Sequence, residues 1–502
     1  MNCARISHWY LLLAVVLFAL GAGSATAQLF NGKWVITEKP LDNGETPLQI
    51  LTIRQDGLTL RADLKKRGWT NHYEGEAQGN HFVLYSHGRQ AKPFLQGELV
   101  GGKLRTPSGD LRPATEQDDP TPAFIPPPAL HVVASNHLAL TPPMGWNSWN
   151  LFAGRINDKI VREIADAMVT SGMRDAGYVY VNIDDTWEAD RDASGNIQIN
   201  RKFHDMKALA DYVHSRGLKL GIYSSPGPKT CAGYTGSFGH EIQDAKTYAA
   251  WGVDYLKYDL CSARNIYKST PEIHQALYQK MGEALQSTGR PIVFSLCQYG
   301  ENDPWKWGAK AGGNLWRTTG DIRDQWQSMD KIGFSQIEIA SYNKPGHWND
   351  PDMLEIGNGG MNADEYRTHM SLWSMLSAPL IAGNDLSNMS DETKSILMNG
   401  EVIAIDQDKA AIPVQRLSKV GDVEILTRTM ADGATVVGLF NRGSEPASVS
   451  LDWSRVGATK GAEIRDLWKH ESVTRNGAAY QASISPHGVV LLRVTPRKDR
   501  SE

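Results

Sequence analysis

Apolar and polar positions alternate along residues 28–115, as in LQILTIRQDGLTLRADL and HFVLYSHG. Glycine-rich turns separate these runs, and the combination is typical of short, half-buried strands. The pattern therefore predicts a small β domain at residues 28–115. The next stretch, residues 116–137, is acidic and rich in proline, which is typical of a semi-rigid linker.

The pattern changes over residues 138–408. Short apolar runs such as YVYVNID, LKLGIYS and PIVFSLC alternate with amphipathic segments such as DKIVREIADAMVTSGM. Strand–helix alternation over this length predicts a (β/α)8 TIM barrel, which typically takes about 250 residues. A doubly wound α/β sheet is the alternative, but the sequence has no G-x-G-x-x-G after a strand and no P-loop.

Strand-like alternation returns over residues 409–502, for example in VEILTRTM, ATVVGLFN and GVVLLRVT. We expect an antiparallel β-sandwich there. The predicted architecture is therefore a (β/α)8 barrel with a C-terminal sandwich and an additional small N-terminal β domain.

The first 27 residues have the layout of a cleavable secretory signal. Arg5 precedes an apolar stretch from Trp9 to Leu20, and small residues follow, ending in Ala25-Thr26-Ala27. The apolar stretch is short for a membrane span, which needs about 20 residues. The sequence thus predicts export, to the periplasm or the medium, and no membrane partner after cleavage.

Composition narrows the class of function only slightly. The chain is 41% apolar and 22% charged with a formal net charge of −4, which gives no reason to expect nucleic acid as a partner. Three cysteines follow the predicted leader, namely Cys231, Cys261 and Cys297. An exported chain can form one disulfide from three thiols, with one cysteine left over.

Carboxylates follow several of the predicted barrel strands. Because catalytic groups of such barrels lie at the carboxyl ends of the strands, we expect these side chains to surround one polar pocket. Tyrosine, glutamine and arginine side chains occupy equivalent positions. The candidates in chain order are Asp184, Asp185, Tyr223, Asp259, Gln298, Tyr299, Arg317, Asp321, Asp350 and Asp352.

Lys257 and Asp259 share one face of a predicted strand, because residues i and i+2 point the same way. Two carboxylates in one pocket can cleave a glycosidic bond, one as the acid and the other as the nucleophile or base. A nearby cation favours the ionised form that a nucleophile needs. We therefore expect Asp259 to be the nucleophile, Lys257 its electrostatic partner, and Asp321 the general acid.

Other chemistries find less support in the sequence. A zinc site is not indicated, because the chain has neither H-x-H nor H-E-x-x-H, and a carboxylate-only metal site is not needed. A serine nucleophile is not indicated either, because no G-x-S-x-G occurs. Structural roles remain as alternatives: helix capping by Asp184-Asp185, a turn held by Asp350, and Trp146 and Trp149 in the core.

Seven segments together resemble glycoside hydrolase family 27, the α-galactosidases and α-N-acetylgalactosaminidases. They are TPPMGWNSWN, NIDDTW, GIYSSPG, WGVDYLKYDLC, FSLCQYG, WRTTGDI and WNDPDMLEIGNGGM, and they follow one another in the family's order. The resemblance extends from about residue 138 to the end. It implies a retaining glycosidase on a (β/α)8 barrel that needs no metal or cofactor, with residues 28–115 outside the family's usual core.

Residue by residue, the resemblance implies a set of roles. Asp259 is the nucleophile and Asp321 the acid/base, while Cys231 and Cys261 form a disulfide beside the nucleophile strand. The sugar is expected to contact Asp184 at O6, Asp185 at O4, Lys257 at O3 and O4, Arg317 at O2, and Trp146 through its apolar face. Gln298, Tyr223, Asp352 and Met353 complete the expected substrate site.

The chain departs from the family pattern at two places. Thr186 and Gly154 stand where many relatives have a pair of bridged cysteines. Gln298-Tyr299 stands where galactosidases of the family commonly have Glu-Trp, and glutamine carries no charge for the sugar's O2 hydroxyl. This second departure concerns recognition at C2 of the sugar.

Three substrate hypotheses and one of another class follow. Terminal α-D-galactosides are favoured because Asp184 is retained at the O6 position, whereas relatives specialised for β-L-arabinopyranosides tend to have glutamate there. α-N-Acetylgalactosaminides are less favoured. A non-catalytic carbohydrate-binding protein is disfavoured by the two catalytic carboxylates. The aromatic residues of the N-terminal domain, Trp34, Trp69, Tyr73 and Phe82, are expected in its core or against the barrel rather than on a polysaccharide.

Overall fold

The computed structural model describes residues 29–37, 48–66, 69–86, 93–118, 124–458 and 462–496. The predicted leader, residues 1–27, lies outside the described residues. The chain forms two compact units, one built mainly from the strands before Asp118 and one that contains residues 119–502. Each unit is described by itself.

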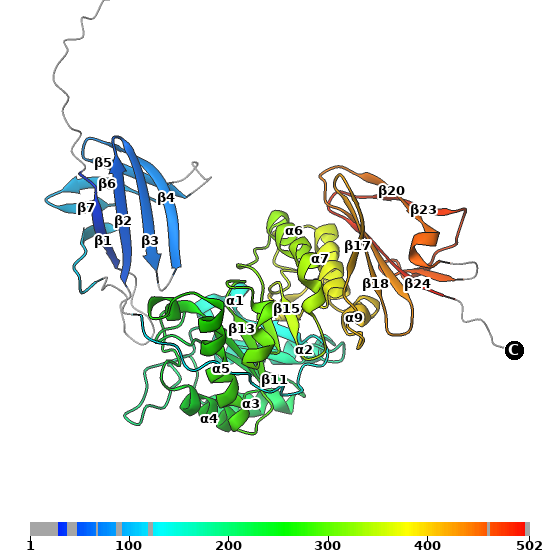
Figure 1. Cartoon of the computed structure of the whole chain (residues 1–502), viewed down its shortest axis with the longest axis horizontal. Helices are drawn as coiled ribbons and strands as arrows, with labels where there is room; N and C mark the ends of the chain where they lie inside the picture. The colour runs from blue at the N-terminus through cyan, green and yellow to red at the C-terminus, as the bar shows by residue number, and fades with distance from the viewer. Residues whose placement is uncertain are drawn as a thin grey trace, which may run out of the picture. The chain divides into compact units, whose positions relative to one another are not determined.

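The N-terminal unit is a closed barrel of eight antiparallel strands in sequence order, drawn in blue in Figure 1. Its first and last strands pair with each other, Trp34 opposite Pro113. Trp34, Tyr73 and Phe82 are buried in its interior, as expected for core residues. The strands are β1 (Gly32–Thr37), β2 (Leu48–Asp56), β3 (Thr59–Lys66), β4 (Trp69–Gln78), β5 (His81–Ser86), β6 (Leu95–Val100), β7 (Lys103–Thr106) and β8 (Gly109–Pro113).

The central part is a parallel eight-stranded sheet whose strands follow chain order, which confirms the predicted (β/α)8 barrel. The sheet closes through a parallel bridge between Leu354 and Ala382, supported by a 2.8 Å hydrogen bond from Leu354 N to Ile381 O. Its strands are β9 (Met144–Asn147), β10 (Tyr180–Asn182), β11 (Lys219–Ser224), β12 (Tyr255–Asp259), β13 (Val293–Cys297), β14 (Leu315–Arg317), β15 (Trp348–Asp350) and β16 (Leu380–Ala382).

Helices between the strands begin at polar caps that the sequence encodes. Asn157, Asp205 and Thr270 each accept a backbone N–H of the first turn, and Asn362 forms a capping box with Glu365. The helices are α1 (Trp149–Phe152), α2 (Asp158–Thr170), α3 (Met206–Ser215), α4 (Glu241–Trp251), α5 (Pro271–Ser287), α6 (Trp326–Ser335), α7 (Ala363–Leu376), α8 (Asp391–Leu397) and α9 (Gly400–Asp406). Among the described residues, none of the helices combines the length and apolar character that crossing a membrane requires.

Short 3₁₀ helices occupy several of the connections. They are η1 (Ala153–Arg155), η2 (Cys261–Asn265), η3 (Pro304–Lys306), η4 (Gly308–Ala311), η5 (Gln336–Tyr342), η6 (Leu386–Asn388) and η7 (Trp453–Val456). Of these, η2 matters most for the site, because it directly follows the strand that ends at Asp259 and carries Arg264.

The C-terminal part consists of a six-stranded antiparallel sheet and a two-stranded one, with an apolar core that includes Leu451 and Trp453. This confirms the predicted sandwich. The larger sheet contains β17 (Gln415–Val420), β18 (Val423–Thr429), β19 (Thr435–Asn441), β24 (Val489–Thr495), β21 (Glu463–Asp466) and β22 (Glu471–Ser472), and the smaller one β20 (Ala447–Asp452) and β23 (Ala479–Ile484).

Helix α7 joins the sandwich to the barrel. It carries hydrogen bonds from Thr368 Oγ1 to the His487 carbonyl at 2.7 Å and from Trp468 Nε1 to Ser371 Oγ at 2.8 Å. It also carries His369, which is fully buried with its ring 4.1 Å from that of Trp373. Neither ring nitrogen of His369 has a hydrogen-bond partner within the described part of the chain.

His369 is expected to make folding stability depend on pH. Burial lowers its pKa to about 3, whereas an unfolded histidine titrates near 6.5. As the pH drops below about 6.5, His369 therefore binds a proton in the unfolded chain but stays neutral in the folded chain. Folding stability falls as a result. His369→Leu should add about 2 kcal/mol more to the free energy of unfolding at pH 5 than at pH 8. Denaturant titrations at both pH values measure this difference, and an equal effect at the two pH values would contradict it.

Candidate active site

A cavity of about 780 Å³ opens at the carboxyl ends of the barrel strands. Side chains from the ends of β10 to β14 and from the loops after β9, β14 and β15 line it, because parallel strands bring their carboxyl ends to one rim. Its polar lining contains most of the residues that the sequence predicts for the site. These are Asp184, Asp185, Tyr223, Cys231, Lys257, Asp259, Arg317, Asp321, Asp352 and Met353.

Asp184 and Asp185 follow β10 and are almost completely buried. Asp184 Oδ2 accepts hydrogen bonds from Lys257 Nζ at 2.7 Å and from Asn147 Nδ2 at 2.9 Å. Asp185 Oδ2 accepts the backbone N–H of Ala232 at 2.6 Å. Burial raises the pKa of Asp185 to about 7, although its hydrogen bonds act in the opposite direction. The pair therefore presents one ion-paired carboxylate and one carboxyl group that exchanges its proton near neutral pH.

Lys257 differs in one respect from the sequence-based expectation. Its ammonium pairs with Asp184, which follows β10, two strands away from β12 in the sheet, because the long side chain reaches across the rim rather than along β12. Burial acts to lower the pKa of Lys257, but the charges of Asp184 and Asp259 help to raise it well above its ordinary value. Lys257 thus stays protonated and serves two carboxylates at once.

Asp259 ends β12 with only 3% of its surface exposed. Burial raises the pKa of Asp259, and Lys257 and the hydrogen bond from Tyr299 only oppose this effect, so the expectation that Lys257 keeps this pKa low is wrong. Tyr299 Oη donates to Asp259 Oδ2 at 2.7 Å. Lys257 thus acts on Asp259 through its charge, whereas the hydrogen bond comes from Tyr299, just after β13.

Arg317 organises the opposite wall. Its guanidinium Nη2 lies 2.6 Å from Asp352 Oδ2 and 3.2 Å from Asp321 Oδ1. Burial raises the pKa of Asp352 above its ordinary value, and Arg317 opposes this rise. The side chain of Asp321 is 67% exposed, whereas that of Arg317 is 4% exposed. Arg317 thus contacts one carboxylate oxygen of Asp321, while most of the Asp321 side chain is open to whatever enters the cavity.

Two regions of the chain match known families. Residues 141–408 match the family model described as alpha galactosidase A, and residues 420–494 match the alpha galactosidase C-terminal beta sandwich domain. The α-galactosidase of Cyamopsis tetragonoloba is 48% identical over 371 residues, which cover 73% of this chain and 89% of that protein. The chain belongs to the α-galactosidase A family. The resemblance to glycoside hydrolase family 27 is thereby confirmed.

Solved structures agree with this membership. The α-galactosidase I of Mortierella vinacea superposes with a TM-score of 0.69 at 38% identity, covering 72% of this chain and 100% of that one. An α-galactosidase of Saccharomyces cerevisiae solved with raffinose gives a TM-score of 0.67 at 29% identity, with 73% and 100% coverage.

Three sequence-predicted candidates of this α-galactosidase family member, Trp146, Gln298 and Asp350, lie outside the cavity lining. Trp146 is completely buried, and its Nε1 donates to the Asn384 carbonyl at 2.8 Å. Trp149, three residues later, lines the cavity instead, so the expectation that Trp146 is the sugar platform needs correction. Gln298 is also completely buried, and its Nε2 donates to the Arg317 carbonyl at 3.0 Å. The Gln298 side chain, which stands where relatives have glutamate, is therefore not exposed to the cavity.

Sequence reasoning missed several lining residues. The sequence places Tyr299 at the end of a strand and marks it as a departure from tryptophan, but assigns it no role, and it treats Trp149 only as a core candidate. Glu355, whose carboxylate accepts from Asn150 and Asn358, was not singled out. Burial raises the pKa of Glu355 to about 7. Its place two residues after Met353 in the same loop was the available signal.

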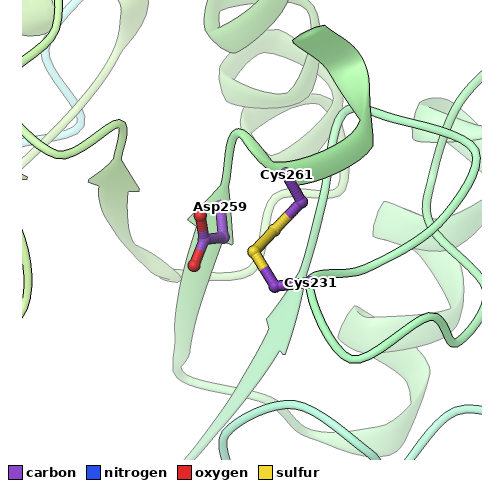
Figure 2. Close-up of side chains that lie close together, drawn as sticks. All are labelled: Cys231, Asp259 and Cys261. Carbon is purple, nitrogen blue, oxygen red and sulfur yellow. A yellow bond between two sulfur atoms is a disulfide. The ribbon is translucent and has the colours of Figure 1, made fainter. Parts of the chain in front are cut away.

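Cys231, Asp259 and Cys261 bring three potential ligand atoms together, as Figure 2 shows. The two sulfurs form a disulfide, which confirms the predicted pairing, and their Cα atoms lie 4.9 Å apart. Bonded sulfurs are not thiolates, which are the form that binds metals. We therefore interpret the cluster as a structural disulfide beside Asp259 rather than as a metal site.

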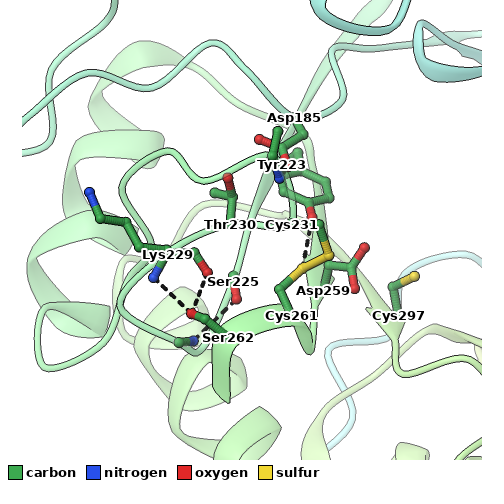
Figure 3. Close-up of a disulfide and its surroundings, with 12 residues drawn as sticks. Asp185, Tyr223, Ser225, Lys229, Thr230, Cys231, Asp259, Cys261, Ser262 and Cys297 are labelled. Atoms are coloured by element: carbon green, nitrogen blue, oxygen red, sulfur yellow. Dashed lines mark hydrogen bonds between the residues drawn. A yellow bond between two sulfur atoms is a disulfide. The ribbon is translucent and has the colours of Figure 1, made fainter. Parts of the chain in front are cut away.

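The disulfide connects the loop after β11 to the start of η2, two residues after the nucleophile Asp259 (Figure 3). Cys261 Sγ lies 3.2 Å from Tyr223 Oη, and Ala232, next to Cys231, donates to Asp185. Reduction would free this loop and withdraw one hydrogen bond from Asp185.

Reduction of the disulfide is expected to lower both stability and catalytic efficiency. The bridge closes a loop with a sequence separation of 30, so its loss should cost about 2–4 kcal/mol of folding free energy. Cys231→Ala/Cys261→Ala should show the same loss and no further response to dithiothreitol. Thermal unfolding and kcat/KM with and without reductant measure this. Unchanged kcat/KM after reduction of the disulfide to two thiols would contradict the positioning role of the loop.

Proposed function

We propose that the protein hydrolyses terminal α-D-galactosyl residues with retention, through a covalent galactosyl–Asp259 intermediate. One observation carries the proposal: Asp259 and Asp321 line the same cavity as the Asp184–Lys257 pair, in a chain of the α-galactosidase A family. Relatives such as the Cyamopsis enzyme are named α-galactosidases. The expected partner is therefore a carbohydrate.

In the first step, the Asp259 carboxylate attacks the anomeric carbon while Asp321 donates its proton to the leaving oxygen. The glycosidic bond breaks as the bond to Asp259 forms. In the second step, Asp321 takes a proton from water, whose oxygen displaces Asp259 and restores the starting configuration. The exposure of Asp321 suits both tasks, because the leaving group and the water must reach it. The route uses neither a metal nor a cofactor.

Two carboxyl groups held in fixed positions support selection of galactose. Galactose differs from glucose by an axial O4. A hydrogen-bond acceptor fixed at that position can bind the axial hydroxyl of galactose but not the equatorial one of glucose. Asp185 is fixed by the N–H groups of Ala232 and Thr186, at 2.6 Å each, and Asp184 by Lys257. A site built to hydrogen-bond a hydroxyl rejects a substrate that leaves its polar groups unpaired.

The cavity supports an oligosaccharide rather than a free monosaccharide as substrate. Its volume of about 780 Å³ falls in the range of pockets that enclose drug-sized ligands. Trp149 lines it and offers an apolar ring face. We also infer that the protein is exported, which rests on the leader-like residues 1–27.

A panel of p-nitrophenyl glycosides tests the proposal. The α-D-galactopyranoside should be hydrolysed with the highest kcat/KM, and the β-L-arabinopyranoside and α-N-acetylgalactosaminide more slowly. A dominant arabinopyranoside rate would assign the chain to the other sugar. Binding of galactose without turnover of any of the three would indicate a non-catalytic carbohydrate-binding protein.

A further inference from the structure

Tyr299 is in an uncommon backbone conformation beside the nucleophile. Its φ is +61°, in the left-handed region that large side chains rarely adopt. The next residue, Gly300, has a φ of +80°, and a Cβ there would lie 2.2 Å from the Thr318 carbonyl oxygen. Strained residues of this kind persist where surrounding structure enforces them, and they cluster at functional sites. The turn carries the side chain of Tyr299 into the cavity wall while Gln298 points into the interior.

Two arginines hold the Tyr299 ring. The guanidinium carbons of Arg264 and Arg317 lie 5.3 Å and 5.7 Å from its centroid. Arg264 is in turn paired with Glu301, its Nη2 lying 2.7 Å from a carboxylate oxygen. A cation within about 6 Å of a ring centroid is attracted to the ring face, so both arginines favour this position of the ring. The phenol oxygen lies 2.7 Å from Asp259 Oδ2, and the disulfide sulfur of Cys231 is farther away at 3.6 Å.

Within the described part of the chain, the Asp259 carboxylate accepts a single hydrogen bond, which comes from Tyr299. The phenol donates to Oδ2 at 2.7 Å, and Oδ1 is buried with no hydrogen-bond partner there. Burial and the charge of Asp259 raise the pKa of Tyr299 well above its ordinary value, so the phenol keeps its proton and remains a donor.

We infer that Tyr299 is a positioning residue of the hydrolytic reaction: its phenol orients the Asp259 carboxylate and favours its ionised form for attack. This inference rests on the proposed function, because it assigns Tyr299 a task only if Asp259 is the nucleophile. Of the two residues that differ from the family's Glu-Trp, Tyr299 is then the one that affects the reaction. A tryptophan at that position has no hydroxyl group to donate to Asp259.

Titratable groups from several elements surround Asp259 and must stay unchanged in any test. They are Asp184 after β10, Tyr223 from β11, Lys257 from β12 itself, Cys297 from β13, Asp321 after β14, Arg264 from η2 and Tyr278 from α5. Tyr299→Phe alters none of them and keeps the ring between the two guanidiniums. The matched control is Tyr178→Phe, which removes a buried phenol that donates to the Leu397 carbonyl at 2.7 Å, outside the cavity lining.

The pH profile of kcat/KM on p-nitrophenyl α-D-galactoside tests the inference. Removing the phenol removes an interaction that lowers the pKa of Asp259, so the acid limb of Tyr299→Phe should move to higher pH. At the wild-type optimum kcat/KM should fall about 10- to 100-fold, mainly through kcat. Tyr178→Phe should keep the wild-type limb. An unmoved limb for Tyr299→Phe, or a change in KM alone, would overturn the inference.

A second measurement follows the nucleophile without the acid. The rate of covalent trapping of Asp259 by 5-fluoro-α-D-galactosyl fluoride depends little on Asp321, because fluoride leaves readily. Trapping should slow in Tyr299→Phe and stay at the wild-type rate in Tyr178→Phe. A wild-type rate in Tyr299→Phe would overturn the inference alone. If the wild-type protein neither hydrolyses α-galactosides nor traps the reagent, the proposed function itself fails.

Discussion

Replacing Asp259 with asparagine is expected to lower kcat on α-galactosides by about 10⁴-fold or more, as removal of a nucleophile does in enzymes with covalent intermediates. The amide has nearly the shape of the carboxylate but cannot attack the anomeric carbon. The side chain is 3% exposed at the end of β12, and no other described carboxylate ends that strand. Initial rates and mass spectrometry of trapped protein measure the loss.

Asp254→Asn is the matched control for this experiment. Asp254 directly precedes the same strand and pairs with Arg290 at 2.6 Å at its opposite end. Its loss should reduce stability and leave the chemistry intact. In Asp259→Gly, azide should restore turnover by entering the vacated space and should yield β-galactosyl azide. Near-normal hydrolysis by Asp259→Asn would contradict the nucleophile assignment.

Replacing Asp321 with asparagine is expected to reduce hydrolysis in proportion to how much the leaving group needs a proton. Melibiose should lose about 10²- to 10⁴-fold in kcat/KM, whereas 2,4-dinitrophenyl α-D-galactoside should lose much less, because its phenolate leaves without help. The second step also lacks its base, so the galactosyl–Asp259 intermediate should accumulate and give a burst of dinitrophenol.

Azide distinguishes the acid/base role from a general loss of structure. The anion needs no deprotonation, so it should accelerate turnover of Asp321→Asn and yield α-galactosyl azide. Equal losses on melibiose and the dinitrophenyl glycoside would contradict the assignment, since an acid acts selectively on poor leaving groups. Asp321 would then be better explained as a structural partner of Arg317, whose Nη2 lies 3.2 Å from its carboxylate.

The position of the site could be predicted from the sequence because it follows from topology. Parallel strands place their carboxyl ends on one rim, so the order of motifs was enough to bring Asp184, Asp259, Arg317 and Asp352 together. Alternation along β12 placed Lys257 and Asp259 on one face, but it did not show that the lysine reaches across to Asp184. Side-chain reach between strands is a three-dimensional property.

The choice between neighbouring residues depended on backbone turns that no periodicity encodes. In GWNSW, strand β9 ends at Asn147 and a helical turn follows, which buries Trp146 and turns Trp149 toward the cavity. In CQYG, the left-handed conformation of Tyr299 decides which of two polar residues meets the nucleophile. The closed form of the N-terminal barrel likewise depends on pairing between its first and last strands, which lie far apart in sequence.

The stereochemistry of hydrolysis tests the central claim most directly. Proton NMR of p-nitrophenyl α-D-galactoside during the first minutes of reaction, before mutarotation, shows which anomer of galactose leaves the enzyme. Attack by Asp259 followed by attack of water from the opposite side inverts the centre twice, so α-galactose should appear first. Initial release of β-galactose would contradict a covalent galactosyl–Asp259 intermediate.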